Sequence, residues 1–271
     1  MDITQNKLSL DQLRKEIDSI DSEIFNLLLK RLSVVKKVGE LKKSNQKNRS
    51  IIRPAREASM VRNIYNKAKK EGLNENISIG FAYLWRQIIS VSVNFEEATN
   101  ICYNKNNKCG LNKAKEYLGI FSEYKDCNSD EEVFTRLENQ TSNIAIFSTK
   151  PNQENFEKPW WLLLSEKYYN ISIFAGFPFF KKQNENEIDL EKISKQISLV
   201  ALSNITPEPS GRDIFVYVLK GNAKNILQDN FIIIDEYNDY KLLFSLENYS
   251  SEHSENSKNY NLKYLGCFAV F

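Results

Sequence analysis

The sequence predicts a multidomain protein, with an N-terminal all-α three-helix domain followed by an α/β part and a small α+β part. From Leu10 to Leu41, and in two further segments that end near residue 98, apolar residues recur at helical spacing. Short apolar runs then alternate with helical segments, and the tail contains mostly strand-like runs. We therefore predict domains over residues 1–98, 106–207 and 208–271, since 271 residues suffice for two or three small domains.

The first predicted helix runs from Leu10 to Leu41. Its apolar residues follow one another at steps of three and four, which is the spacing of one helix face. Ser9 and Gln12 have the spacing of a capping box, and the polar stretch 44–50 ends the helix. Such a helix is ~50 Å long at a rise of about 1.5 Å per residue.

Two further helices complete the first domain. The second begins at Pro54, a residue favoured in the first turn, and ends before Gly72; the third spans about Ile77 to Glu97. The residues expected to face inward are Ala58, Val61, Ile64, Tyr65 and Ala68 on the second helix, and Phe81, Leu84, Trp85, Ile88, Ile89 and Phe95 on the third.

Two basic residues of the first helix lie where only apolar residues are expected. Arg31 falls within the apolar stripe, and Lys42 follows on the same face, because eleven residues turn a helix by almost whole turns. A cation that faces a core is costly unless an anion meets it. No acidic residue of this helix shares that face nearby, so we expect an anionic ligand; a coiled-coil seam without a ligand is the alternative.

The length of this helix predicts a second copy of the chain. A domain of about 95 residues is ~25–30 Å across, so two shorter helices cannot cover a stripe of ~50 Å. The exposed remainder predicts an interlocked homodimer. Arg14 lies about 25 Å along the axis from Arg31, which is too far to serve the same site, so we expect it to serve the partner's site.

Polar residues on the second and third helices add to this site. Arg53 and Arg56 lie at the start of the second helix, where free N–H groups attract anions, although ordinary surface charge is an alternative explanation. Glu57 is favourable in a first turn, yet it also follows the inward face. Ser92 and Glu96 face inward on the third helix. Together these residues predict a polar pocket inside a helical shell.

At this point the sequence resembles the all-helical chorismate mutases over residues 8–98, in the form common among alphaproteobacterial members. The motifs that carry the resemblance are Leu13-Arg14-Lys15-Glu16-Ile17-Asp18-Ser19-Ile20-Asp21, Leu29-Lys30-Arg31, Val38-Gly39-Glu40-Leu41-Lys42, Arg53-Pro54-Ala55-Arg56-Glu57 and Trp85-Arg86-Gln87-Ile88-Ile89-Ser90. The resemblance implies the rearrangement of chorismate to prephenate, a step in phenylalanine and tyrosine biosynthesis.

The resemblance also implies residues that bind the two substrate carboxylates. Arg31 and Arg14 of the partner subunit would each hold one carboxylate, in the planar geometry that guanidinium groups favour. Lys42 would contact a carboxylate and the ether oxygen. Arg56 and Ser92 would support the carboxylate shell.

The remaining site residues would serve the ring hydroxyl and the breaking bond. Glu57 would accept from the ring hydroxyl, and Glu96 would donate to the ether oxygen, where many relatives have glutamine. A glutamate donates a hydrogen bond only when protonated, so activity is expected to fall as pH rises through neutrality, unless nearby cations hold Glu96 ionised. Arg53 stands where other members have an acidic residue that contacts the substrate hydroxyl, which leaves its role undefined.

This chemistry needs neither a cofactor nor a metal. The rearrangement is one unimolecular pericyclic step, and the enzyme has to hold a flexible dianion in a compact chair and stabilise charge on the breaking C–O bond. The only histidine, His253, falls in a polar segment expected to be a loop. We therefore expect Lys42, Glu96, Arg31 and Arg14 to be the catalytic groups.

The remainder of the chain is expected to begin with a linker, Cys102–Lys115. The predicted strands are Ile144–Phe147, Ile171–Ala175, Leu199–Leu202, Ile214–Leu219, Phe231–Ile234, Lys241–Leu246 and Lys263–Val270, and the predicted helices are Asp130–Asn139, Leu190–Gln196 and Ala223–Asp229. Trp160 and Trp161 are expected to be buried by packing rather than to stack on a ligand.

This order is similar to that of the bifunctional mutase–prephenate dehydratases with a regulatory ACT domain, whose close resembles Tyr264-Leu265-Gly266-Cys267-Phe268. The dehydratase Thr-Arg-Phe motif is missing, because the nearest stretch, 209–215, has no threonine before Arg212. The Gly-Ala-Leu and Glu-Ser-Arg-Pro signatures of the ACT site are absent too. We therefore expect residues 106–271 to be a degenerate, catalytically silent relative.

Composition and charge limit the alternatives. Residues 1–98 carry a net charge of +6 and the rest −4, so the basic domain suits a small anionic substrate as well as nucleic acid, and a solvated surface is the alternative. No apolar run is long enough for a membrane span, and the four cysteines lack metal-ligand spacing, so we expect a cytoplasmic protein that binds neither membranes nor nucleic acid. Two alternatives stay open: a bifunctional mutase–dehydratase, and a non-enzymatic dimeric adaptor with a basic groove.

Overall fold

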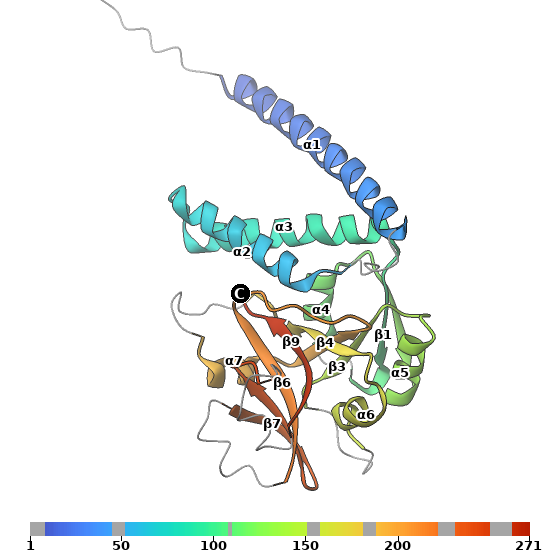
Figure 1. The fold of residues 1–271 in the computed structure, drawn as a ribbon. Helices are drawn as coiled ribbons and strands as arrows, with labels where there is room; N and C mark the ends of the chain where they lie inside the picture. Colours follow the sequence, from blue (N-terminus) through green and yellow to red (C-terminus); the bar gives the residue numbers. More distant parts are fainter. Residues whose placement is uncertain are drawn as a thin grey trace, which may run out of the picture. The chain divides into compact units, whose positions relative to one another are not determined.

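The computed structural model describes residues 9–44, 52–107, 110–150, 158–180, 188–221, 231–249 and 262–271. Contacts divide the chain into two compact units, residues 1–51 and 52–271, which are considered separately below (Figure 1). The predicted helix over 223–229, His253 and Cys109 lie outside the described residues. No helix among the described residues is long and apolar enough to cross a membrane.

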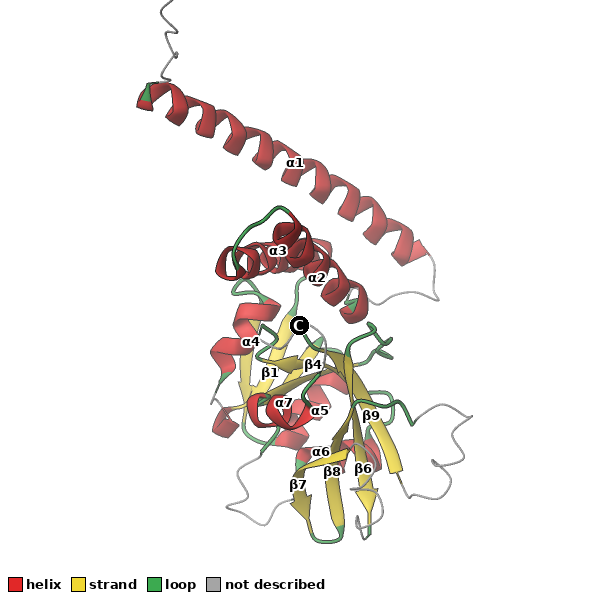
Figure 2. Ribbon diagram, turned by 90° about the vertical axis from the view of Figure 1, so that its left-hand side faces the viewer, coloured by secondary structure: helices red, strands yellow, loops and turns green. Residues whose placement is uncertain are grey.

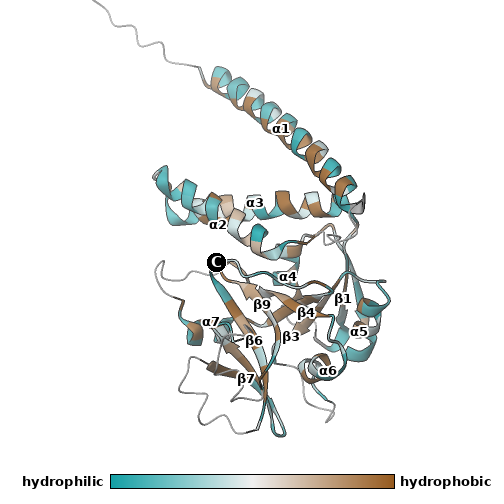
Figure 3. Ribbon diagram, in the orientation of Figure 1, coloured by the Kyte–Doolittle hydropathy of each residue, from teal (hydrophilic) through white to brown (hydrophobic). Residues whose placement is uncertain are grey.

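The described element of the first unit is helix α1, Leu10–Ser44, as predicted. Its capping box is confirmed: the Gln12 backbone N–H donates to Ser9 Oγ at 3.2 Å, and the Ser9 N–H donates to Gln12 Oε1 at 2.8 Å. Hydrophobic and hydrophilic residues alternate along the helix (Figure 3). Its exposed apolar side chains are Leu10, Leu13, Ile17, Ile20, Ile24, Phe25, Leu27, Leu29, Val34, Val38 and Leu41.

The second unit begins with two helices that pack on each other, α2 (Pro54–Lys70) and α3 (Glu75–Glu96). The α2 face is as predicted, with Ala58, Val61 and Ala68 buried. The predicted inward face of α3 is partly wrong, because Phe81, Leu84 and Phe95 are exposed. Ile89 and Ser92, which were also predicted to face inward, are buried, together with Ser78, Ala82, Arg86 and Ser90.

One nine-stranded sheet follows, with the order β2-β1-β3-β5-β4-β9-β6-β8-β7 (Figure 2). Its strands are β1 Asn100–Asn104, β2 Glu123–Cys127, β3 Ile144–Ser148, β4 Ser172–Phe177, β5 Leu199–Ser203, β6 Asp213–Lys220, β7 Phe231–Tyr237, β8 Tyr240–Ser245 and β9 Leu262–Ala269. The strands of both predicted C-terminal parts, residues 106–207 and 208–271, belong to this one sheet. Strand β4 meets β9 in parallel at a single register pair, Ile173 and Gly266.

Helices cover both faces of the sheet. The remaining helices are α4 Leu111–Leu118, α5 Asp130–Glu138, α6 Trp160–Lys167 and α7 Leu190–Gln196. Alternate residues of β3 enter different cores, as the period of a strand requires: Ala145 and Phe147 pack with α5, α6 and α7, whereas Ile144 and Ile146 pack with α2, α3 and α4. Helices α2 and α3, which carry two of the motifs that resemble a chorismate mutase, therefore share a core with the sheet.

The expected linker at Cys102–Lys115 is wrong. Strand β1 extends to Asn104 and is followed by the 3₁₀ turn Lys105–Asn107 and by α4. The stretch is polar in composition, but β1 pairs in parallel with β2 on one side and β3 on the other, and these backbone hydrogen bonds do not depend on hydropathy. The other predicted strands and helices that lie within the described residues are present.

The predicted order of parts is confirmed: long N-terminal helices precede a mixed α/β region and then a strand-rich tail. The domain limits at residues 98, 106 and 207 stay predictions. Among β1 to β5, some strand pairs are parallel and others antiparallel. In the tail, β6 pairs antiparallel with β8 and with β9, and β7 pairs antiparallel with β8.

Candidate active site

Three of the predicted site residues lie on α1, in the first unit. Arg31 and Lys42 are both partly exposed, and eleven residues of unbroken helix place them on one face. Arg14 is mostly exposed and forms an ion pair with Asp11 at 3.5 Å, one helical turn away. Seventeen residues of the same helix, about 25 Å along its axis, separate Arg14 from Arg31. That the two serve different sites stays a prediction.

The start of α2 carries three more. Arg53 is its N-cap residue, without a side-chain cap, and both Arg53 and Arg56 are exposed. Glu57 in contrast is buried, with 6% of its surface exposed. Its Oε1 accepts from the Arg53 backbone N–H at 3.0 Å, which satisfies one of the free donors at the helix start.

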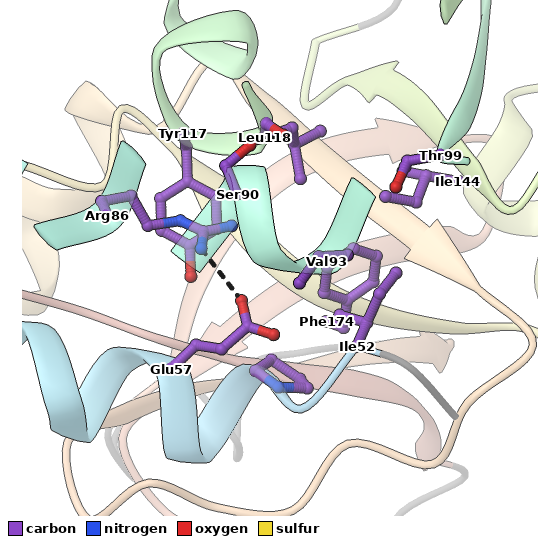
Figure 4. Close-up of a pocket in the computed structure, with 11 residues that line it drawn as sticks. Ile52, Glu57, Arg86, Ser90, Val93, Thr99, Tyr117, Leu118, Ile144 and Phe174 are labelled. Atoms are coloured by element: carbon purple, nitrogen blue, oxygen red, sulfur yellow. Dashed lines mark hydrogen bonds and ion pairs between the residues drawn. The ribbon is translucent and has the colours of Figure 1, made fainter. Parts of the chain in front are cut away.

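The other carboxylate oxygen of Glu57 faces a cation that the site prediction omits. Arg86 Nη1 of α3 lies 3.2 Å from Glu57 Oε2, and both side chains are almost fully buried (Figure 4). No aligned hydrogen bond is formed by Arg86 Nη1 or Nε within the described residues, so this contact is an ion pair. Arg86 belongs to the motif at Trp85–Ser90, but its place among the small residues of α3 does not by itself indicate burial in the sequence.

An aromatic ring supports the same cation. The Arg86 guanidinium carbon lies 4.0 Å from the centre of the Tyr117 ring on α4. Burial raises the pKa of Tyr117 to about 12, with Arg86 lowering it and Glu57 raising it by smaller amounts, so the ring is neutral at ordinary pH. A neutral aromatic face attracts a guanidinium group, and more strongly where water is excluded.

A small cavity with room for roughly one water molecule lies beside this pair. It is lined by Ile52, Pro54, Glu57, Arg86, Ser90, Val93, Thr99, Tyr117, Leu118, Ile144 and Phe174 (Figure 4). Of the predicted site residues, this cavity includes Glu57 alone. It is too small for a substrate with a six-membered ring.

The predicted residues at the end of α3 lie elsewhere on that helix. Ser92 is buried and donates from Oγ to the Ile88 carbonyl at 2.7 Å. Glu96 is the last residue of α3 and is partly exposed. The roles that the resemblance assigns to these residues stay predictions.

Direct hydrogen bonds hold α2 and α3 to the rest of their unit. Arg62 of α2 donates to the carbonyls of Ser210 and Val270 at 2.9 and 2.8 Å. Ser90 Oγ of α3 donates to the Leu118 carbonyl at 2.7 Å, at the end of α4. Helices α2 and α3 are thus attached to the sheet region at two separate places.

The described polar groups of the sheet region include two tryptophans and a partly buried carboxylate. Trp160 and Trp161 are buried, as predicted: Trp160 stacks on Phe147, and Trp161 Nε1 donates to Asp235 Oδ2 at 2.8 Å. Burial raises the pKa of Asp235, although this hydrogen bond opposes the shift. Among the described residues no group of histidine, cysteine and acidic side chains could hold a metal ion.

Comparison with known proteins identifies the N-terminal region. Residues 13–97 match the family model of chorismate mutase type II. The chain is 30% identical over 144 residues to a bifunctional chorismate mutase/prephenate dehydratase of Aquifex aeolicus, an alignment that covers 51% of this chain and 38% of that protein. The chain thus spans well under half the length of this relative. The resemblance expected from the sequence is confirmed for residues 13–97.

Three solved structures are similar at TM-scores of 0.38 to 0.40. A prephenate dehydratase from Streptococcus mutans has a TM-score of 0.40 at 13% identity and covers 64% of this chain and all of its own. A quorum quenching acylase, GqqA, has a TM-score of 0.40 at 8% identity, with 64% and 95% covered. A prephenate dehydratase from Arthrobacter aurescens in complex with L-Phe has 0.38 at 7%, with 63% and 90% covered.

Proposed function

We propose that this chain is a cytoplasmic chorismate mutase, which rearranges chorismate to prephenate. The observation that carries the proposal is the match of residues 13–97 to the type II family model. The motif residues fit this chemistry, which needs positioned cations and hydrogen-bonding groups rather than a nucleophile or a cofactor. The three buried free cysteines of the described residues suit a reducing compartment.

Arg31 and Arg14 of the partner subunit hold the two carboxylates in this proposal, and Arg56 and Ser92 support them. The two fixed carboxylates keep the substrate in its compact chair, which removes the entropy cost of reaching it in solution. The proposal requires a homodimer, because Arg14 and Arg31 of one α1 are too far apart to share one substrate.

Lys42 and Glu96 act on the breaking C–O bond. Lys42 meets the negative charge that develops on the ether oxygen, and Glu96 donates to the same atom. Glu57 accepts from the ring hydroxyl. A carboxylate has about four acceptor positions, and the hydrogen bond from the Arg53 N–H uses one of them, so Glu57 keeps acceptor positions for this role.

The test is the loss of chorismate, followed by absorbance, in the full-length protein. Replacing Lys42 with alanine is expected to lower kcat by about 10²–10³-fold, as for the loss of one oxyanion donor. Lys37→Ala, at an exposed position of the same helix, serves as the matched control and is expected to retain the wild-type rate. Absence of turnover in the wild type would favour the dimeric adaptor instead.

The role of Glu96 has its own test. Glu96→Gln keeps a donor at all pH values, so we expect the decline of turnover above neutral pH to disappear in this variant. A wild-type rate that is constant from about pH 5 to pH 9 would contradict a donating glutamate.

A bifunctional mutase–dehydratase is the second candidate. The alignment with the Aquifex aeolicus protein covers 51% of the chain, which is more than residues 1–97, and therefore includes part of the sheet region. The same assay separates the two candidates: prephenate accumulates if the sheet region is catalytically silent, and phenylpyruvate forms if it is a dehydratase.

A further inference from the structure

The buried ion pair at the start of α2 includes Glu57, a proposed substrate ligand. Glu57 is tied through one oxygen to the N-cap of its own helix and through the other to Arg86 of α3. Neither side chain is more than 8% exposed. A carboxylate held at both oxygens in a water-poor site has one orientation, so whatever fixes Arg86 also fixes Glu57.

Arg86 is itself fixed from the sheet region. Its guanidinium group lies over the Tyr117 ring at 4.0 Å, and Tyr117 belongs to α4, which is outside the chorismate mutase match at 13–97. The residues next to Tyr117 hold α3 in place as well: Gln87 Nε2 donates to the Glu116 carbonyl at 2.6 Å, and Ser90 Oγ donates to the Leu118 carbonyl. The residues on both sides of Tyr117 thus contact α3.

We propose that Arg86 is a positioning residue for Glu57, and that Tyr117 of α4 holds Arg86 in place, so the sheet region orients the hydroxyl-recognition group of the mutase site. This inference rests on the proposed function. It gives the sheet region a task that does not depend on a dehydratase activity or on a bound effector. Arg86 acts through Glu57 and has no contact of its own with substrate.

The test is a double-mutant cycle in KM and kcat for chorismate with full-length Glu57→Gln, Arg86→Gln and the double variant. Arg86→Gln is expected to raise KM about tenfold or more with kcat little changed. The reason is that a misplaced Glu57 loses its hydrogen bond from the substrate hydroxyl in the ground state and the transition state alike. In the Glu57→Gln background the same change is expected to have almost no further effect on KM, because Arg86 acts only through Glu57.

Controls separate positioning from general damage. Ser90→Ala removes the hydrogen bond from α3 to the Leu118 carbonyl at the end of α4 and leaves Glu57 unchanged. It is expected to leave KM within twofold of the wild type. Tyr117→Phe keeps the ring and is expected to behave like the wild type, whereas Tyr117→Leu is expected to raise KM severalfold. These tyrosine variants leave the charged pair intact and serve where Arg86→Gln does not fold.

The outcomes distinguish this inference from the proposed function. If the wild type converts chorismate but the effects on KM add in the double variant, or Ser90→Ala matches Arg86→Gln, the positioning role is wrong and the mutase remains. If the wild type has no turnover, the proposed function fails, and the positioning role fails with it.

Discussion

At the scale of single residues, Glu57 and Arg86 show how burial changes the energy of an ion pair. An exposed pair contributes about 0–1 kcal/mol, because water screens the charges. Removal of one member of a buried pair costs about 3–5 kcal/mol, because the other charge is left without compensation. The side chains of Glu57 and Arg86 are 8% and 4% exposed, so the cost of a buried pair applies here.

We therefore expect Glu57→Gln to lower the free energy of unfolding by about 3 kcal/mol. Glutamine keeps an oxygen for the Arg53 backbone N–H, so the change removes the charge and little else. Urea unfolding followed by circular dichroism measures the effect. The matched control is Glu123→Gln, whose pair with Lys125 at 3.3 Å is 62% and 39% exposed and is expected to matter by less than about 0.5 kcal/mol. Equal losses in the two variants would contradict this account.

The described cysteines give a second residue-scale prediction. Burial raises the pKa of Cys102 to about 12, and it also raises the pKa of Cys127 and Cys267. Because the thiolate is the reactive form, these three thiols are expected to resist alkylation at pH 8 in the native protein and to react fully in denaturant. Peptide mapping by mass spectrometry after iodoacetamide treatment measures this. Rapid native labelling of Cys102 would show that the core around β1 opens easily.

Helical spacing was sufficient to predict that Glu57 and Ser92 are buried, because each follows an apolar face. It was not sufficient for Arg86. A basic residue on a face of small side chains is as consistent with solvent as with burial until its partners are known, and those partners, Glu57 and Tyr117, lie about 30 residues away on either side.

At the scale of elements, α1 and α2 were predictable from their start signals, and α3 from the spacing of its apolar residues. Ser9 with Gln12 caps α1, and Pro54 begins α2. Helix α3 begins at Glu75, two residues before the predicted start, because the Asn74 side chain caps it by accepting from the Ile77 N–H. Strands β1 and β2 lack such signals. Strand β1 has only three apolar residues in a row, and β2 is an edge strand with a charged surface, as edge strands commonly are.

The face of α1 makes an element-scale prediction. Its apolar stripe is exposed along the described helix, with Ile24 at 50%, and an exposed stripe of this length needs a partner. We expect the protein to sediment as a homodimer and Ile24→Glu to shift it toward the mass of one 31.6 kDa chain. The control is Glu23→Gln, an exposed change beside it. A wild type that is monomeric at micromolar concentration would contradict the shared site.

At the scale of the whole molecule, the sheet is the feature that sequence patterns could not supply. Hydropathy predicted the strands from β3 to β9 one by one, but not that they form one sheet. The joining pair, β4 with β9, brings together segments almost a hundred residues apart, and such pairing is decided by packing rather than by local propensity. Two separate small domains were the natural expectation from the strands alone.

The join also depends on one glycine. Gly266 has φ +137°, and a Cβ atom there would lie 2.2 Å from the Ile173 carbonyl oxygen, so a side chain would force β4 and β9 apart. We expect Gly266→Ala to lower the free energy of unfolding by about 3 kcal/mol or more, through backbone strain and overpacking together. Because β4 packs in the core that also contains α2 and α3, we expect mutase activity to fall at the same denaturant concentration as the sheet signal.

Gly80→Ala is the control for this prediction. Gly80 lies within α3, and a Cβ atom there meets nothing within 4 Å, so alanine is expected to stabilise the helix by up to about 1 kcal/mol. Denaturant curves followed by both circular dichroism and chorismate turnover compare the two variants. If Gly266→Ala unfolded the sheet while turnover persisted to the wild-type midpoint, the two helices would be independent of the sheet, and the shared core would not couple them.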